Sequence, residues 1–272
     1  MNNILREFSE KRVIVMAAPN GARRGKQDHP ALPVTASELA DEAIALRDAG
    51  VAVLHLHVRD AEGRHTLDPG RYREALSAIR AAVGDELVVQ VTTEAVGRYS
   101  IDEQMAVIRD LQPEAVSVAL KEFCPTTADE TAFGELCHWM RSSGVWPQYI
   151  LYDSEDVKRF HALRASGTIV DEEPFVLFVL GKYSDAIGGG VGELDTLLRA
   201  ADPLACPWAA CCFGSDEHTV MRSAFARGGH VRIGFENNVL LSGGTPAPNN
   251  AALIQEFTAA AAEGTRKLAT AD

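Results

Sequence analysis

The segment Val51-Ala-Val-Leu-His-Leu-His-Val-Arg-Asp60 carries more structural information than any other stretch of the sequence. It begins as a short apolar run with β-branched residues, typical of a buried strand, and it ends in polar residues. The windows Glu38–Asp48 before it and Arg71–Val83 after it repeat apolar residues at the 3.6-residue spacing of a helix. The segment therefore predicts a strand with a helix on either side along the chain.

The same alternation continues from one end of the chain to the other. Short apolar runs are separated by helix-like windows, and successive runs begin about one strand–helix unit apart. The runs are eight in number: Val13–Ala18, Val51–His57, Leu87–Thr92, Ala115–Leu120, Pro147–Tyr152, Pro174–Leu180, Trp208–Phe213 and His230–Glu236.

The segments between the runs carry the chemistry of helix starts. Three of them fit the capping box, in which a hydroxyl and a carboxylate satisfy free backbone N–H groups of the first helical turn. Helices are therefore expected to begin at three boxes: Thr35-Ala-Ser-Glu38, Ser100-Ile-Asp-Glu103 and Thr127-Ala-Asp-Glu130.

Eight strand–helix alternations predict a parallel sheet, because parallel neighbours need crossover helices between them. We expect an α/β fold consisting of a single (β/α)8 TIM barrel domain over residues 1–272, a length typical of that architecture. A doubly wound open sheet is the rival fold. It usually carries a glycine-rich phosphate turn after its first strand, and Ala17-Ala-Pro-Asn-Gly21 does not have that pattern.

The composition restricts the classes of function. Twenty-six basic and 38 acidic residues give a formal net charge of −12, which disfavours nucleic-acid binding because phosphate contacts need clustered Lys and Arg. No apolar run has the ~18–20 residues of a membrane span, and the first residues show no secretory signal. The five cysteines fit no disulfide framework. We expect a cytoplasmic protein with reduced thiols and neither a membrane nor a nucleic-acid partner.

His55 and His57 are the first candidate functional residues. Side chains alternate along a strand, so the two imidazoles point to the same side. They come at the carboxyl end of the second predicted strand, where barrel active sites form. A histidine pair of this spacing can bind zinc, although a lone strand histidine is more often a buried structural residue. Other histidines, among them His65, are expected at the surface or on helices.

Glu236 is the candidate third ligand. It ends the eighth run, on which Arg232, Gly234 and Glu236 are expected to share one face. In a closed barrel the eighth strand lies beside the first and the first beside the second, so Glu236 can reach the histidines. Two histidines and one carboxylate leave positions open for substrate, which indicates a catalytic zinc or Fe(II) site. The alternative is a simple ion pair between Glu236 and Arg232.

Taken together, these residues resemble the β-keto acid cleavage enzyme family, of the 3-keto-5-aminohexanoate type. The motifs that carry the resemblance are His55-Leu-His-Val-Arg-Asp60 and His230-Val-Arg-Ile-Gly-Phe-Glu-Asn-Asn238. The resemblance extends over nearly the whole chain. Further matching segments are Pro30-Ala-Leu-Pro-Val-Thr35, Gln90-Val-Thr-Thr93, Pro113-Glu114 and Gly243-Gly-Thr-Pro-Ala-Pro248.

The resemblance implies a (β/α)8 barrel in which the two histidines and Glu236 hold Zn²⁺ or another divalent ion. It implies a reaction in which a β-keto acid and acetyl-CoA give acetoacetate and a new acyl-CoA. Arg232 matches a catalytic arginine beside the metal, and Thr92 and Ser117 match hydroxyls that bind substrate. It also implies a homo-oligomer, often a tetramer.

Two predicted catalytic positions differ from the family pattern or supplement it. Asn237 stands where the family has an aspartate, and an amide cannot accept a proton at neutral pH, so the usual general base is missing. Glu94, at the rim of the third strand, is the candidate substitute, and a solvated loop glutamate is the alternative. The change at Asn237 leaves two other functions open: a metal-dependent lyase or hydrolase without CoA, and a non-catalytic metal-binding relative.

Arg23 stands where the named type has a glutamate that receives an amino group. Exchanging an acceptor for a cation reverses the charge preference, so we expect Arg23 to bind a substrate whose distal end is anionic or polar. Arg23, Arg24 and Lys26 form a basic cluster, for which binding of CoA phosphates or simple solvation are the alternatives. After the fourth run, Lys121-Glu-Phe-Cys124 replaces a glycine-rich stretch of the family and is expected to narrow the pocket.

Overall fold

The computed structural model describes residues 12–181, 190–201, 206–262 and 267–268. Within them, eight parallel strands close into a barrel in the order β10-β11-β2-β3-β6-β7-β8-β9. The closed barrel confirms the predicted architecture and excludes the open sheet. Its strands are β2 (Val15–Ala17), β3 (Val53–Leu56), β6 (Val88–Val91), β7 (Ala115–Ala119), β8 (Trp146–Leu151), β9 (Phe175–Leu180), β10 (Trp208–Cys212) and β11 (His230–Ile233).

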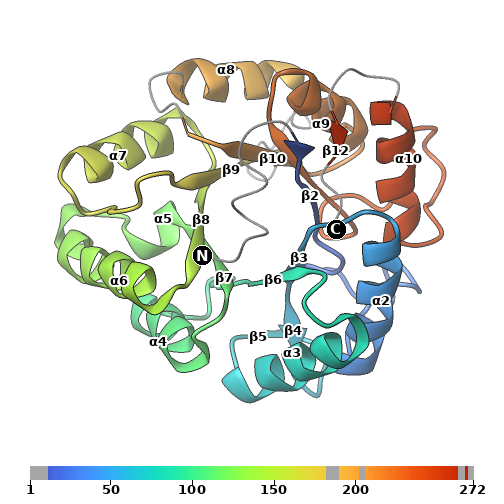
Figure 1. Ribbon diagram of the computed structural model, residues 1–272, viewed down its shortest axis with the longest axis horizontal. Coiled ribbons are helices and arrows are strands. Elements are labelled where there is room, and N and C mark those ends of the chain that lie inside the picture. The colour runs from blue at the N-terminus through green and yellow to red at the C-terminus, as the bar shows by residue number, and fades with distance from the viewer. Residues whose placement is uncertain (1–11, 182–189, 202–205, 263–266, 269–272) are drawn as a thin grey trace.

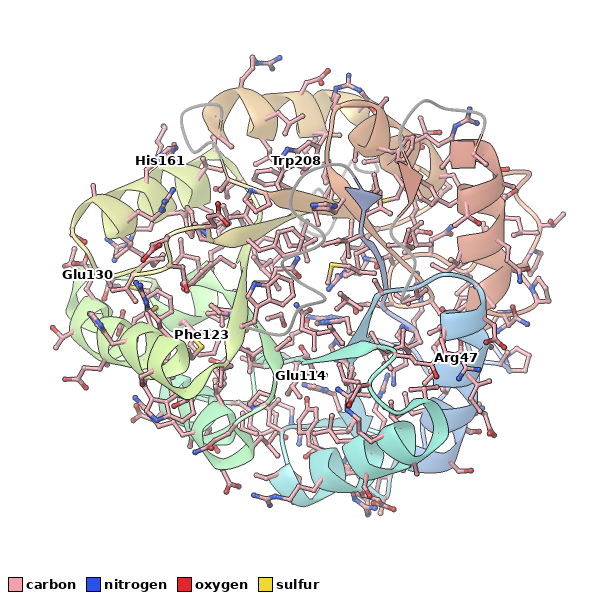
Figure 2. The ribbon with its side chains drawn as sticks, viewed as in Figure 1. Arg47, Glu114, Phe123, Glu130, His161 and Trp208 are labelled. Atoms are coloured by element: carbon pink, nitrogen blue, oxygen red, sulfur yellow. The ribbon has the colours of Figure 1, made fainter. Side chains whose placement is uncertain are left out.

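Helices surround the barrel, as Figure 1 shows. They are α2 (Ala36–Asp48), α3 (Pro69–Val83), α4 (Ile101–Leu111), α5 (Leu120–Phe123), α6 (Glu130–Ser143), α7 (Ser154–Ala165), α8 (Val191–Ala201), α9 (Glu217–Ala226) and α10 (Asn250–Ala262). Their apolar faces pack on the strands: Phe123 is fully buried, whereas Arg47 lies on the outer ring (Figure 2). Among the described residues, no helix combines the length and the apolar character needed to cross a membrane.

Two short sheets supplement the barrel. One joins β1 (Arg12–Val13) in parallel to β12 (Lys267–Leu268), so segments from opposite ends of the chain lie side by side. The other pairs β4 (Val58–Arg59) antiparallel with β5 (His65–Thr66), directly after β3. This hairpin continues the chain from the histidine motif.

The helix starts agree with the capping chemistry of the sequence, with one shift. The capping boxes at Thr35 and Ser100 are both present with reciprocal hydrogen bonds. The third box was wrong by one residue, because Thr126 and Asp129 form it at the start of a short 3-10 turn. Glu130 is consequently the first residue of α6.

The interior of the barrel is filled by layers of side chains, and alternate strands supply successive layers. One fully buried layer combines two amides with a thioether, and the layer above it combines charged and polar groups that face the mouth of the barrel. The lower layer contains Met16, Gln90 and Gln148, and His55, Ser117 and Arg232 belong to the upper layer. The upper layer forms the floor of the site described next.

Candidate active site

A cavity opens at the carboxyl ends of the barrel strands, where the functional sites of this fold form. Polar groups from β3, β6, β7 and β11 line one part of it, and apolar groups from β7, β8 and β9 line the other. The lining residues are His55, His57, Thr92, Thr93, Glu94, Ser117, Ala119, Glu122, Ile150, Tyr152, Val179, Arg232 and Glu236.

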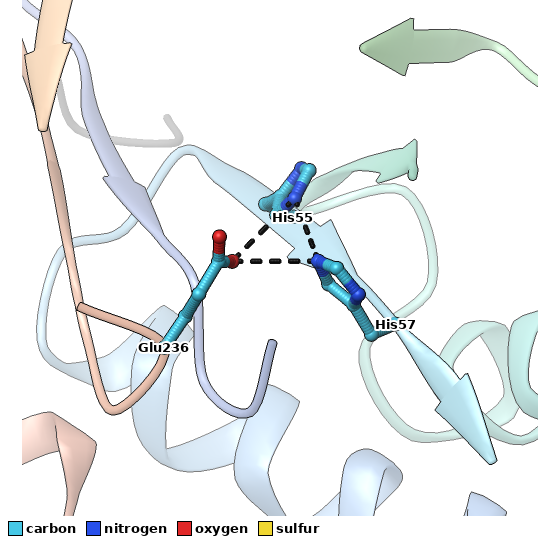
Figure 3. A group of neighbouring side chains, drawn as sticks. All are labelled: His55, His57 and Glu236. Atoms are coloured by element: carbon cyan, nitrogen blue, oxygen red, sulfur yellow. Dashed lines mark hydrogen bonds and ion pairs between the residues drawn. The ribbon is translucent and has the colours of Figure 1, made fainter. Parts of the chain in front are cut away.

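His55, His57 and Glu236 converge at the floor of this cavity, as the sequence predicted (Figure 3). The Nε2 atoms of the two imidazoles are 3.1 Å apart. Oε2 of Glu236 lies 3.6 Å from Nε2 of His55 and 3.4 Å from Nε2 of His57. All three side chains are buried, and their free ligand atoms face one another, so together they could hold a divalent metal ion.

Arg232 provides the compensating charge beside this group. One of its terminal nitrogens lies 3.0 Å from Oε1 of Glu236 and 3.2 Å from the sulfur of Cys211. Burial disfavours the guanidinium charge, yet Cys211 and Glu236 raise the pKa of Arg232 above its ordinary value. The ion pair and the three-residue cluster therefore coexist: Arg232 uses one oxygen of the carboxylate and the histidines face the other.

The same charges set the protonation of Glu236 and His55, the two candidate ligands nearest to Arg232. Burial opposes ionisation of Glu236, but Arg232 and the imidazoles hold the pKa of this carboxyl well below its ordinary value. Burial and the nearby guanidinium lower the pKa of His55 well below its ordinary value. A carboxylate and a neutral imidazole are the states that bind a metal.

Glu236 reaches the site from a turn and not from a strand, which corrects the sequence argument. β11 ends at Ile233, and Glu236 lies in the turn that follows it. Gly234 has a φ of +150°, and a Cβ on it would lie 2.3 Å from the carbonyl oxygen of Ala18. That close approach aligns the turn with the loop after β2, where the backbone N–H of Glu236 donates to the Ala18 carbonyl at 3.0 Å.

The loop after β2 positions both halves of the cluster. Arg24 donates to the backbone carbonyls of Phe235 and Glu236 at 2.6 and 3.1 Å. Asn20 donates through its side chain to the carbonyl of His57 at 3.0 Å. Gly21 lies against Glu236, and a Cβ on it would be 2.5 Å from the Cγ of that residue. One loop thus holds the carboxylate turn and the histidine segment at a set separation.

Arg59 braces that loop from the opposite side, a role that the sequence analysis missed. This buried guanidinium donates to the carbonyl of Arg24 at 2.8 Å and to the carbonyls of Asn20, Gly21 and Ala22. Several carbonyls aimed at one cation fix the path of a loop that has no regular structure of its own. The arginine two residues after His57 was the available signal, since a buried Arg is rarely without a specific partner.

The basic cluster predicted after the first strand separates into three roles. Arg24 points inward and holds the turn of Glu236, as described above. Lys26 forms an ion pair with Glu38 at 2.6 Å. Arg23 is exposed and does not line the cavity. Arg24 and Lys26 thus both have partners within the protein, and ligand binding by the cluster stays a prediction.

The remaining predicted site residues divide into two groups. Thr92, Ser117 and Glu94 all line the cavity. Asn237 does not line it; within the described residues neither atom of its buried side-chain amide makes a hydrogen bond. From the segment after β7, Glu122 lines the cavity and accepts hydrogen bonds from the backbone N–H of Ala95 and from the side-chain amide of Gln104.

His65 contradicts the expectation of a surface histidine. It is 3% exposed, and its ring centroid lies 5.2 Å from that of His57. Its Nε2 is 2.9 Å from the carbonyl oxygen of Glu94, and burial lowers the pKa of His65 to about 3. A neutral His65 therefore packs behind the cluster and ties the β5 hairpin to the rim of β6.

Sequence comparison places the chain among characterised proteins. The pattern of the beta-keto acid cleavage enzyme family matches residues 12–272. The chain is 29% identical over 269 residues to the 3-keto-5-aminohexanoate cleavage enzyme of Acetoanaerobium sticklandii, covering 96% of this chain and 95% of that one. It is 30% identical over 264 residues to the 3-oxoadipate:acetyl-CoA acetyltransferase of Cupriavidus necator, covering 94% of this chain and 91% of that one.

Structural comparison supports the same fold. The ternary complex of ObcA with a C4-CoA adduct and oxalate superposes with a TM-score of 0.73 at 14% identity, covering 89% of this chain and 66% of that chain. At this identity the likeness concerns the barrel and not its chemistry. The family match over nearly the whole chain carries the assignment: the chain belongs to the beta-keto acid cleavage enzyme family and is an enzyme of the acyl-transferring, carbon–carbon bond-cleaving class.

Proposed function

We propose that the chain binds a divalent metal ion, zinc by preference, at His55, His57 and Glu236 and exchanges carbon units between a β-keto acid and acetyl-CoA. The products are acetoacetate and a new acyl-CoA. The convergence of two imidazole nitrogens and one carboxylate oxygen at the floor of the cavity is the observation that carries this proposal. The family membership supplies the reaction class.

The donor set fits zinc by its chemistry and by its spacing. Zinc binds imidazole nitrogen and carboxylate oxygen at about 2.0–2.2 Å, so neighbouring tetrahedral ligands are about 3.3–3.6 Å apart. The three ligand atoms here are separated by 3.1, 3.4 and 3.6 Å. Oε2 of Glu236 is buried and accepts no hydrogen bond from the described residues. A catalytic zinc with three protein ligands keeps a position open for substrate.

A metal ion bound here would act as a Lewis acid toward the keto oxygen, which makes the adjacent carbon acidic. Thr92 and Ser117 are proposed to position the substrate carboxylate and keto group, since both hydroxyls line the cavity. Arg232, buried and cationic, stabilises negative charge that develops beside Glu236.

The atoms of the proposed reaction balance without a further reactant. Removal of the α-proton gives an enolate whose carbon attacks the acetyl thioester and releases the CoA thiolate. The thiolate then attacks the original keto carbon, and the bond between that carbon and the α-carbon breaks. The acyl-CoA leaves, and the proton returns to the released acetoacetate carbon.

Glu94 is proposed as the base that carries this proton, in place of the aspartate that Asn237 replaces. It lines the cavity, whereas Asn237 does not. Glu94→Gln should lower kcat by about 10²–10⁴, the usual contribution of a general base. An unchanged kcat in Glu94→Gln would overturn this role. Restoration of kcat by Asn237→Asp in the Glu94→Gln background would show that a carboxylate at position 237 can still act as the base.

The distal end of the substrate is proposed to be anionic or polar. Arg23 supports this proposal, because it is exposed on the loop after β2 and forms no ion pair within the described residues. Glu94 and Glu122 line the cavity itself, so an anionic tail would extend outward toward the loop. Initial rates with neutral, cationic and dicarboxylic β-keto acids test the proposal, and a clear preference for a cationic substrate would overturn it.

Metal analysis combined with an acetoacetate assay, run with and without acetyl-CoA, tests the function as a whole. Bound metal and turnover that requires acetyl-CoA are the expected results. Turnover without acetyl-CoA would instead favour a metal-dependent lyase or hydrolase, and bound metal without turnover would favour a non-catalytic relative.

A further inference from the structure

A chain of buried polar contacts leads from His55 across the barrel to Gln148 on β8 and returns to Met16 on β2, the strand beside β3. Nδ1 of His55 lies 2.8 Å from Oε1 of Gln90, its neighbour on β6. The side-chain amide of Gln90 donates to Oε1 of Gln148 on β8 at 3.2 Å. The amide of Gln148 in turn donates to the sulfur of Met16 on β2 at 3.5 Å. Every member is at most 2% exposed, so water does not compete for these contacts.

The thioether of Met16 at the end of this chain fixes which end of each glutamine amide faces which neighbour. Methionine sulfur accepts a weak hydrogen bond and has no hydrogen to donate. If the amide of Gln148 were reversed, its oxygen would oppose the sulfur of Met16, and two acceptors would face each other. The NH₂ group of Gln148 therefore faces the sulfur, which leaves its oxygen facing Gln90.

The orientation of the Gln148 amide fixes that of the Gln90 amide. The oxygen of Gln148 requires the NH₂ group of Gln90, so the oxygen of Gln90 faces His55. An acceptor at that place requires a proton on Nδ1 of the imidazole. A neutral histidine has only one ring proton, and Nε2 of His55 is consequently left with its lone pair directed at His57 and Glu236.

We infer that Met16, Gln148 and Gln90 form a relay that selects the Nδ1-protonated tautomer of His55 and so keeps its Nε2 ready to bind the metal. These three are positioning residues, since they act only through His55. The inference rests on the proposed metal site. A partner on the second nitrogen of a ligating histidine commonly contributes 10–100-fold to metal affinity.

The opposite tautomer shows what the relay prevents. With both amides reversed, the NH₂ group of Gln90 would face Nδ1 and the ring proton would move to Nε2. The Nε2–H group could then donate a hydrogen bond to Glu236. In that state Nε2 of His55 has no lone pair with which to bind the metal ion. Each glutamine amide could adopt either orientation, so within the relay only the sulfur of Met16 favours one orientation over the other.

Met16→Leu tests this directly, because the change conserves volume while removing the acceptor. Met140→Leu is the matched control, since Met140 is fully buried on α6, outside the barrel. Two-bond ¹H–¹⁵N spectra of the full chain, as purified and after chelation, report the tautomer of His55, which a His55→Gln variant assigns. Competition with a chromophoric chelator measures the zinc Kd.

We expect His55 protonated at Nδ1 in the unchanged protein and divided between both tautomers in Met16→Leu. The zinc Kd should rise about 10-fold in Met16→Leu and about 100-fold in Gln90→Leu, with Met140→Leu within about twofold of the unchanged protein. A proton on Nε2 in the unchanged protein, or an unaltered tautomer and Kd in Met16→Leu, overturns the relay. A relay with the expected tautomer in a protein that binds no divalent metal would overturn the proposed function alone.

Discussion

The two sides of the barrel mouth differ in polarity and in the number of hydrogen bonds that hold them. On the side of β11, β2 and β3, charged and polar groups converge, and a loop held by Arg24, Asn20 and Arg59 fixes their separation. On the side of β7, β8 and β9, the cavity wall is largely apolar, with Ile150 and Val179 among its residues.

The difference suggests separate roles for the two sides: the polar side for the reaction and the apolar side for substrate selectivity. Ligands of a metal must meet within a few tenths of an ångström, so their side of the mouth needs many directional hydrogen bonds to the backbone. An apolar wall discriminates by volume, and each methylene contributes about 1–3 kcal/mol. Changes on the first side should therefore abolish the reaction, whereas changes on the second should redirect it.

Glu236→Gln should have the largest effect, because an amide cannot replace a carboxylate as metal ligand and partner of Arg232. We expect loss of bound metal and a fall in kcat/KM of about 10³ or more. Glu122→Gln, on the opposite wall, is the control and should retain the metal. Elemental analysis of the metal content and the rate of acyl-CoA formation test this prediction. A Glu236→Gln variant that keeps its metal would contradict the proposed metal site.

Arg24→Met should have an intermediate effect. It frees the carbonyls of Phe235 and Glu236 and loosens the turn that presents the carboxylate, so metal affinity should fall about 10–100-fold. Arg23→Met alters the adjacent, exposed arginine and should leave the metal affinity unchanged. Equal losses of metal affinity in the two variants would show that the affinity depends on the net charge of the loop and not on the hydrogen bonds of Arg24.

Ile150→Ala should change selectivity by a smaller factor. The shorter side chain enlarges the apolar wall, so the ratio of kcat/KM for a longer to a shorter neutral β-keto acid should rise about tenfold. Metal content should stay at the unchanged level. If the ratio does not move, the substrate tail does not lie against β8.

Glu217→Gln should have the smallest effect on catalysis, because we expect it to change the pH dependence of stability. Burial raises the pKa of Glu217 to about 8, so between pH 4.5 and 8 the folded chain holds a proton that the unfolded chain releases. Stability should fall as pH rises through this range, by up to about 1.4 kcal/mol per unit from this group. Urea unfolding at several pH values should show a shallower dependence in Glu217→Gln; identical slopes would show that Glu217 is ionised in the folded protein.

Much of the site was predictable because it depends on local pattern and closed topology. The strand alternation of the histidine motif and the adjacency of first and last strands were sufficient to bring His55, His57 and Glu236 together. The reason given for Glu236 was only partly right, since a period of two does not describe the turn after Gly234. Neither the inward direction of Arg24 nor the burial of His65 has a signal in residue spacing.

The amino-acid order by itself determined the barrel, because eight apolar runs with capped helices between them have few other ways to bury their strands. It also determined the candidate metal-binding group, since those residue types lie at or just beyond strand ends that a barrel must bring to one mouth. Only the tertiary structure decided which charges serve the protein's own framework and which face the cavity. Hydrogen bonds from Arg24 and Arg59 to carbonyls, and the amide chain that ends at Met16, join segments whose separation along the chain carries no information about contact.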